Sequence, residues 1–95
     1  MEKLTQEQID EKLVDFPEWT QIGDTIQRTF RFDDFLGSMA FISRVADLAE
    51  EQQHHPDILI RYNKVTLTLS THDAGGITER DFTLSRAMDS CGAVA

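Results

Sequence analysis

The chain has 95 residues, with 17 Asp and Glu against 9 Lys and Arg, which gives a formal net charge of −8. This length supports one hydrophobic core, so we predict a single domain over residues 1–95. The acidic balance disfavours nucleic acid and anionic membranes as partners, because the basic residues are not expected to cluster. No apolar run reaches the ~20 residues of a membrane span, and the polar start is unlike a secretion signal, so we expect a cytoplasmic protein.

The first predicted element is a short helix that begins after Thr5. The Thr5 hydroxyl is placed to cap this helix, with Gln8 at the third position of a capping box. Leu4 and Ile9 occupy the positions of a hydrophobic staple, and Pro17 lies beyond the end of the helix. Residues 19–32 then hold two short runs around Gly23-Asp24, which predicts a β-hairpin.

The longest predicted helix starts at Asp33 or Asp34, either of which can cap it. It must stop near residues 53–55, because Pro56 disfavours the helical conformation of the residue before it. The two histidines at 54 and 55 therefore lie at an element boundary. Apolar residues return at the spacing of one helical face, and the expected buried positions are Phe35, Met39, Ile42, Val45, Ala46 and Ala49.

A second hairpin is predicted from two alternating runs, residues 58–62 and 65–70, interrupted by Asn63-Lys64. A loop over residues 71–76 follows, and Thr78 with Asp81 reads as a capping box that opens a last helix. The element order is α-β-β-α-β-β-α. We therefore predict an α+β fold, a four-stranded antiparallel sheet with three helices packed on one face.

The strongest chemical signal is the set of three histidines, His54, His55 and His72, which all stand at the ends of elements. Imidazole changes its charge near neutral pH, so such a set suits acid-base catalysis. For His54-His55 alone, simple interaction with the carbonyls at a helix end is an equally good interpretation. Metal binding is less favoured, because the side chains of adjacent residues usually diverge.

Two carboxylates are candidates to assist these histidines. Asp81 has a structural role in the capping box, and it could also reach a histidine on the preceding loop and fix its tautomer. Glu50 precedes His54 by one helical turn, so we expect the two side chains to lie near one another.

Taken together, these residues resemble the pterin-4a-carbinolamine dehydratase family. The resemblance extends from residue 30 to residue 81, and no single piece of it would be specific. The pieces that carry it are Phe30-Arg31-Phe32-Asp33-Asp34-Phe35, Arg44-Val45-Ala46, Ala49-Glu50, His54-His55-Pro56, Tyr62-Asn63-Lys64-Val65, Ser70-Thr71-His72 and Glu79-Arg80-Asp81.

The resemblance implies dehydration of a 4a-hydroxytetrahydropterin to a quinonoid dihydropterin, with the pterin as substrate and neither a metal nor a bound cofactor. It assigns proton transfer to His54 and His72, pterin holding to His55, and orientation of the imidazoles to Asp81 and Glu50. Family members form dimers or tetramers, so a homo-oligomer is expected. The alternative is a non-catalytic binding module on the same scaffold, acting as a dimerisation cofactor or assembly factor. The implied pterin-binding residues are Gln53, His54, His55, Pro56, Ser70, Thr71, His72 and Asp73.

Overall fold

The computed structural model describes residues 2–93, and within this range the chain forms three α-helices, four strands and one 3-10 helix. The predicted order of helices and strands is confirmed. In chain order the elements are α1 (Gln6–Leu13), β1 (Thr20–Ile22), β2 (Thr25–Arg31), α2 (Phe35–Gln52), β3 (Asp57–Arg61), β4 (Lys64–Leu69), η1 (His72–Ala74) and α3 (Glu79–Ala93).

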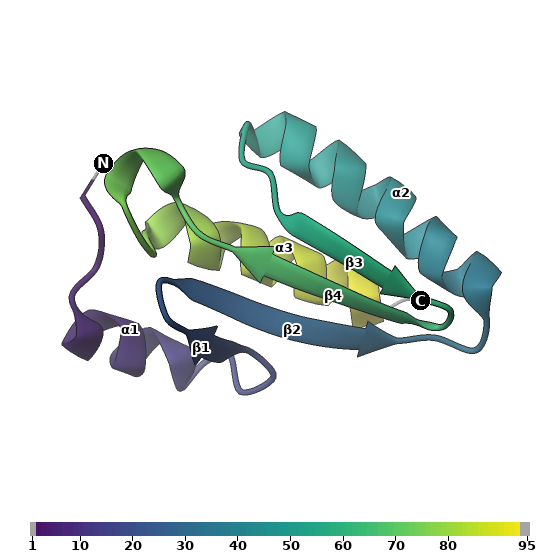
Figure 1. Cartoon of the computed structure of the whole chain (residues 1–95), viewed down its shortest axis with the longest axis horizontal. Helices are drawn as coiled ribbons and strands as arrows, with labels where there is room; N and C mark the ends of the chain where they lie inside the picture. Colours follow the sequence, from purple (N-terminus) through teal and green to yellow (C-terminus); the bar gives the residue numbers. More distant parts are fainter. Residues whose placement is uncertain (1, 94–95) are drawn as a thin grey trace.

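The four strands form one antiparallel sheet in the order β1-β2-β4-β3. Figure 1 shows α3 behind the strands, α2 alongside β3 and α1 beside β1. The other sheet face is mostly polar, apart from the exposed Ile22 and Leu59, and there Thr29 and Thr66 share a hydrogen bond across β2 and β4. The predicted α+β fold is therefore confirmed. Its core joins one sheet face to the helices through buried residues that include Ile9, Ile26, Phe30, Phe41, Val45, Val65, Leu67, Leu69, Phe82 and Met88.

The helix starts follow the sequence closely. Thr5 accepts a hydrogen bond from the Gln8 backbone N–H, and the Gln8 side chain accepts one from the Thr5 N–H, which completes the predicted capping box. Asp34, one of the two predicted candidates, caps α2 by accepting a hydrogen bond from the Gly37 N–H. These caps satisfy donors that the first turn of a helix leaves without partners.

The predicted buried face of α2 is wrong in part. Phe35 and Met39 are 47% and 40% exposed, and Ala46 is also exposed. The helix carries apolar residues on more than one face, so periodicity alone could not choose the face that meets the sheet. Aromatic packing decides which face of α2 is buried, because the centroids of the Phe41 and Phe30 rings lie 4.6 Å apart. The buried positions of α2 are Ser38, Phe41, Val45 and Ala49.

The turn between β3 and β4 also differs from the prediction. Tyr62 and Asn63 form the turn, with Tyr62 at a φ of 54°, and Lys64 already belongs to β4. This register pairs Lys64 with Arg31 on one side and Arg61 on the other. Three basic residues therefore form a cross-strand row, so the expectation that they do not cluster is wrong.

Within residues 2–93, no helix has both the length and the apolar character that crossing a bilayer requires.

Candidate functional site

A pocket of about 220 Å³ lies at the end of the sheet away from the β3–β4 turn. Because β3 and β4 are antiparallel, the start of β3 lies beside the end of β4, where Asp57 pairs with Thr68. The residues before β3 therefore meet those after β4, and the first turn of α3 completes the wall. The lining residues are Gln53, His54, His55, Ser70, Thr71, His72, Asp73 and Arg80.

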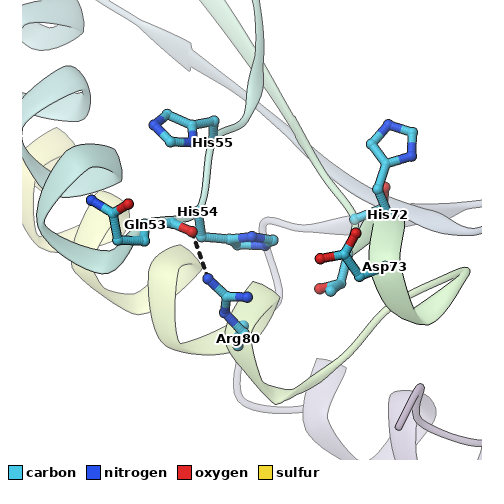
Figure 2. A pocket seen from close by; sticks show the side chains of 8 residues that line it. Gln53, His54, His55, His72, Asp73 and Arg80 are labelled. Atoms are coloured by element: carbon cyan, nitrogen blue, oxygen red, sulfur yellow. Dashed lines mark hydrogen bonds between the residues drawn. The ribbon is translucent and has the colours of Figure 1, made fainter. Parts of the chain in front are cut away.

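The end of α2 separates the two adjacent histidines. Gln53 is the C-cap and adopts the left-handed conformation, with a φ of 52°. Its backbone N–H bonds the carbonyls of Ala49 and Glu50, which closes the helix. The chain then leaves the helix without regular structure until β3 begins. Figure 2 shows the result, with the ring of His54 directed into the pocket and the ring of His55 turned away.

His54 is buried and bonded to a carboxylate. Its Nε2 lies 2.5 Å from Oδ1 of Asp81, which is fully buried. The other Asp81 oxygen accepts hydrogen bonds from the Thr71 hydroxyl at 3.0 Å and from the Thr78 backbone N–H at 2.9 Å. Three donors therefore fix the carboxylate, and the carboxylate fixes the imidazole ring.

Asp81 has the capping role predicted for it and also bonds a histidine, but not the histidine that we expected. It caps α3 through the Thr78 N–H, as the capping box predicts, although the Thr78 hydroxyl bonds the Arg80 N–H. The histidine that it reaches is His54, whereas we expected one on the preceding loop, which holds His72. A neutral imidazole bonded through Nε2–H to a carboxylate keeps its lone pair on Nδ1. This arrangement can supply a base of defined orientation.

Glu50 bonds His55, so the prediction that it approaches His54 is wrong. The expected one-turn spacing does not apply, because α2 ends at Gln52 and His54 follows a left-handed residue. The Glu50 carboxylate instead meets Nε2 of His55, and both side chains are exposed. The pair lies at the rim of the site, and Glu50 is not among the residues that line the pocket.

The opposite wall is built by the loop after β4. The Thr71 N–H bonds the Gly76 carbonyl, which closes the loop, and Gly75 has a φ of 76° that favours glycine. His72 and Asp73 lie on η1 and are exposed, with their side chains across the pocket from Gln53 (Figure 2). The loop thus brings a third imidazole to the pocket that holds His54.

Seven of the eight residues implied to bind pterin line this pocket. Pro56 does not line it, and lies in the short segment between the end of α2 and the start of β3. Sequence reasoning missed Arg80 as a lining residue, although a cation in the first turn of a helix is an unfavourable placement that could have marked it. Within residues 2–93, no group of three or more His, Cys, Asp or Glu side chains is placed to hold a metal ion.

Comparisons with known proteins agree on one family. The family model described as pterin 4 alpha carbinolamine dehydratase matches residues 2–91. A relative from Thermomicrobium roseum, provisionally named a pterin-4-alpha-carbinolamine dehydratase, is 52% identical over 88 residues, covering 93% of this chain and 95% of its own. One from Thermosynechococcus vestitus with the same provisional name is 45% identical over 93 residues, covering 98% of each chain.

Two solved structures share the fold. A crystal structure from Brucella melitensis, described as a transcriptional coactivator/pterin dehydratase, superimposes with a TM-score of 0.91 at 34% identity, covering 95% of this chain and 98% of its own. A pterin dehydratase-like protein identified as a RuBisCO assembly factor in the alpha-carboxysome gives a TM-score of 0.65 at 23% identity, covering 78% and 86%, and shows the fold alone. The match of the family model over nearly the whole chain, supported by these relatives, means that this chain belongs to the pterin 4 alpha carbinolamine dehydratase family of hydro-lyases.

Proposed function

We propose that this chain dehydrates a 4a-hydroxytetrahydropterin to a quinonoid dihydropterin and water. The observation that carries the proposal is the buried His54–Asp81 pair in a pocket that also holds His55 and His72. Family membership supplies the reaction class, and the pocket supplies side chains that can move protons at neutral pH. The pterin is the substrate, and the reaction needs no metal or bound cofactor.

The chemistry requires one acid and one base. The C4a–O bond breaks, and the departing oxygen takes a proton from the acid and leaves as water. The base removes the N5 proton, and the N5–H electron pair forms the C4a–N5 double bond. Hydroxide is a poor leaving group, so protonation of the oxygen as it departs lowers the barrier.

His54 is assigned as the base at N5. Its Nε2 is committed to Asp81, so its Nδ1 carries the lone pair that can accept a proton. The buried carboxylate also stabilises the imidazolium that forms.

His72 is assigned as the acid at the 4a-oxygen. It lies on the opposite wall and is exposed, so it can take up a proton from solvent after each turnover. His55, oriented by Glu50 at the rim, holds the pterin with Gln53, Ser70, Thr71 and Asp73.

The assignment is tested by stopped-flow ultraviolet absorbance of freshly generated 4a-hydroxytetrahydropterin. We expect the parent protein to accelerate loss of the carbinolamine, and His72→Ala to lose most of this acceleration with its fold intact. His72 is exposed and on a short loop, so its removal should leave the circular dichroism spectrum and thermal midpoint unchanged. A well-folded parent that gives only the spontaneous rate would contradict the proposal and favour a binding role for the scaffold.

We also propose that the chain forms a homo-oligomer. The sheet edge β3 carries Ile58 and Leu59 at 42% and 55% exposure, and α2 carries Phe35, Leu36 and Met39 at 47%, 76% and 40%. A free edge strand with apolar neighbours favours pairing with another chain. Light scattering should give a mass of two or four chains, and Leu59→Lys should lower that mass. A monomer at micromolar concentration would contradict this proposal.

A further inference from the structure

Arg80 is the lining residue that the proposed chemistry leaves without a role. It lies in the first turn of α3, where the helix dipole disfavours a cation. Its half-buried side chain crosses to the end of α2, where Nη2 donates hydrogen bonds to the carbonyls of Gln53 at 2.6 Å and Gln52 at 3.3 Å. The last carbonyls of a helix have no partner within it and form its negative pole, so the guanidinium is bound where a cation is favoured.

These two carbonyls determine where the guanidinium lies. Among the ion pairs of residues 2–93, none involves Arg80, so no carboxylate competes with the carbonyls for it. Figure 2 shows the guanidinium below His54, with the bond to the Gln53 carbonyl as a dashed line. The contact joins the end of α2 to the start of α3, the two places in the fold from which His54 and Asp81 reach the pocket.

The Gln53 carbonyl belongs to the peptide group that joins Gln53 to His54. The N–H of the same peptide group is that of His54, and it donates a hydrogen bond to the Ala49 carbonyl at 3.0 Å. A peptide group is planar, so a hydrogen bond at each end fixes its orientation and, with it, the Cα atom of His54. Of these two bonds, only the one to Ala49 is left when Arg80 is removed.

A second contact lies one residue further along both segments of the chain. Arg80 and Asp81 are consecutive, as are Gln53 and His54. Arg80 binds the Gln53 carbonyl, and Asp81 binds the His54 ring. The first contact holds the backbone from which the imidazole projects, and the second holds the ring itself. Together they determine where Nδ1, the atom assigned as the base, is placed in the pocket.

We propose that Arg80 is a positioning residue for His54, an inference that rests on the proposed function. It acts on the reaction through the Gln53–His54 peptide group and not through contact with the pterin. Proton transfer depends on the distance and angle between N5 and Nδ1, and a misplacement of about 1 Å can lower a rate about 100-fold. Without Arg80, His54 keeps its lone pair and its carboxylate but meets N5 less well.

Stopped-flow kinetics of Arg80→Met test this role, because the substitution keeps an unbranched side chain and removes its donors. We expect kcat to fall by ~10–100-fold, with KM and the Kd of the unreactive ligand 6-methylpterin within about threefold of the parent. Arg80→Lys keeps a charged donor without the planar fork, so it should recover part of the lost kcat. Arg86→Met is the matched control, since it makes the same change at an exposed position of α3 and should leave kcat unchanged.

A double-mutant cycle asks whether Arg80 acts through His54. If it does, Arg80→Met should cause no further loss of kcat in the His54→Gln background, because the group that Arg80 positions is already gone. Losses that multiply in the double variant would mean that Arg80 acts on the substrate directly, which would overturn the inference. An Arg80→Met variant with the parent's kcat per folded molecule would overturn it too, because its role would then be structural or confined to binding.

Hydrogen exchange separates this inference from the proposed function, because it needs no turnover. The His54 N–H lies in the peptide group that Arg80 holds, so in Arg80→Met it should exchange about tenfold faster or more. The N–H of the fully buried Leu67 in β4 serves as the reference and should exchange as in the parent.

The two proposals therefore fail in different ways. If the parent accelerates carbinolamine loss but Arg80→Met changes neither kcat nor His54 exchange, the positioning role is wrong and the dehydratase stands. If the parent gives only the spontaneous rate, the proposed function fails and the role of Arg80 in catalysis fails with it. Faster His54 exchange in Arg80→Met would still show that Arg80 holds this peptide group.

Discussion

His54 and His55 are consecutive residues that each bond a carboxylate through Nε2, yet one pair is buried and the other lies in solvent. The His54 and Asp81 side chains are 9% and 0% exposed, whereas those of His55 and Glu50 are 60% and 73% exposed. Asp81 accepts two further hydrogen bonds from the protein. An exposed pair such as His55–Glu50 contributes ~1 kcal/mol or less and is screened by salt.

The end of a helix can therefore place two adjacent identical residues in different surroundings. The left-handed Gln53 directs His54 inward to a fixed carboxylate and leaves His55 at the rim. A ring held in one orientation suits proton transfer, where geometry decides the rate. An exposed ring at the rim suits contact with the substrate.

The largest effect is expected when the buried carboxylate is altered. Asp81→Asn replaces one acceptor oxygen with a donor, so at least one of its three partners loses its acceptor or His54 changes tautomer. We expect turnover to fall by ~10²–10⁴ and the free energy of unfolding to fall by ~1–3 kcal/mol. Stopped-flow assays and urea denaturation measure the two effects.

Glu50→Gln is the matched control, because it makes the same chemical change at the exposed pair. It should change stability by less than ~0.5 kcal/mol, as is usual for surface substitutions. Its turnover should stay within about tenfold of the parent, since the loss of an exposed pair is small. Equal losses in the two variants would mean that burial of the pair does not govern its role.

A smaller effect is expected from the hydroxyl that supports Asp81. Thr71→Val keeps the side-chain shape and removes a buried hydroxyl bonded to both Asp81 and Thr78. We expect a loss of ~1–2 kcal/mol in the free energy of unfolding and a fall in turnover smaller than that of Asp81→Asn. A Thr71→Val enzyme slower than Asp81→Asn would contradict the order of importance within this network.

The smallest effect concerns the opposite end of β4, where Lys64 lies between Arg31 and Arg61. Like charges on neighbouring strands repel, so Lys64→Gln should raise the free energy of unfolding by roughly 0.2–1 kcal/mol at low salt. The gain should disappear at high salt, and turnover should not change. A destabilised Lys64→Gln variant would show that the row is stabilised by contacts other than charge.

The sequence predicted the parts of the fold that depend on local chemistry. Thr5, Asp34 and Pro56 set helix ends through capping and a missing donor, and those effects act within a few residues. The buried face of α2 could not be predicted, because it depends on Phe41 meeting Phe30 across the core. Apolar spacing on a helix with several apolar faces does not contain that information.

The site shows the same division. The histidines and Asp81 could be identified as candidates because imidazole and carboxylate chemistry is visible in the sequence. Their hydrogen-bond partners could not be predicted. Glu50 and His54 are separated by a left-handed residue, and Asp81 reaches His54 only through tertiary packing. Arg80 reaches the pocket because it bonds the carbonyls of Gln52 and Gln53 at the end of α2, a contact between elements that are far apart in the chain.

The roles of the two adjacent histidines are tested most directly by making the same substitution at each and measuring single-turnover loss of 4a-hydroxytetrahydropterin. The buried pair is assigned to proton transfer, so His54→Gln should slow the reaction by ~10²–10⁴ at saturating substrate. His55→Gln should mainly raise KM, with kcat within about tenfold of the parent. Equal losses of kcat in the two variants, or a larger loss in His55→Gln, would contradict the assignment of proton transfer to the buried His54–Asp81 pair.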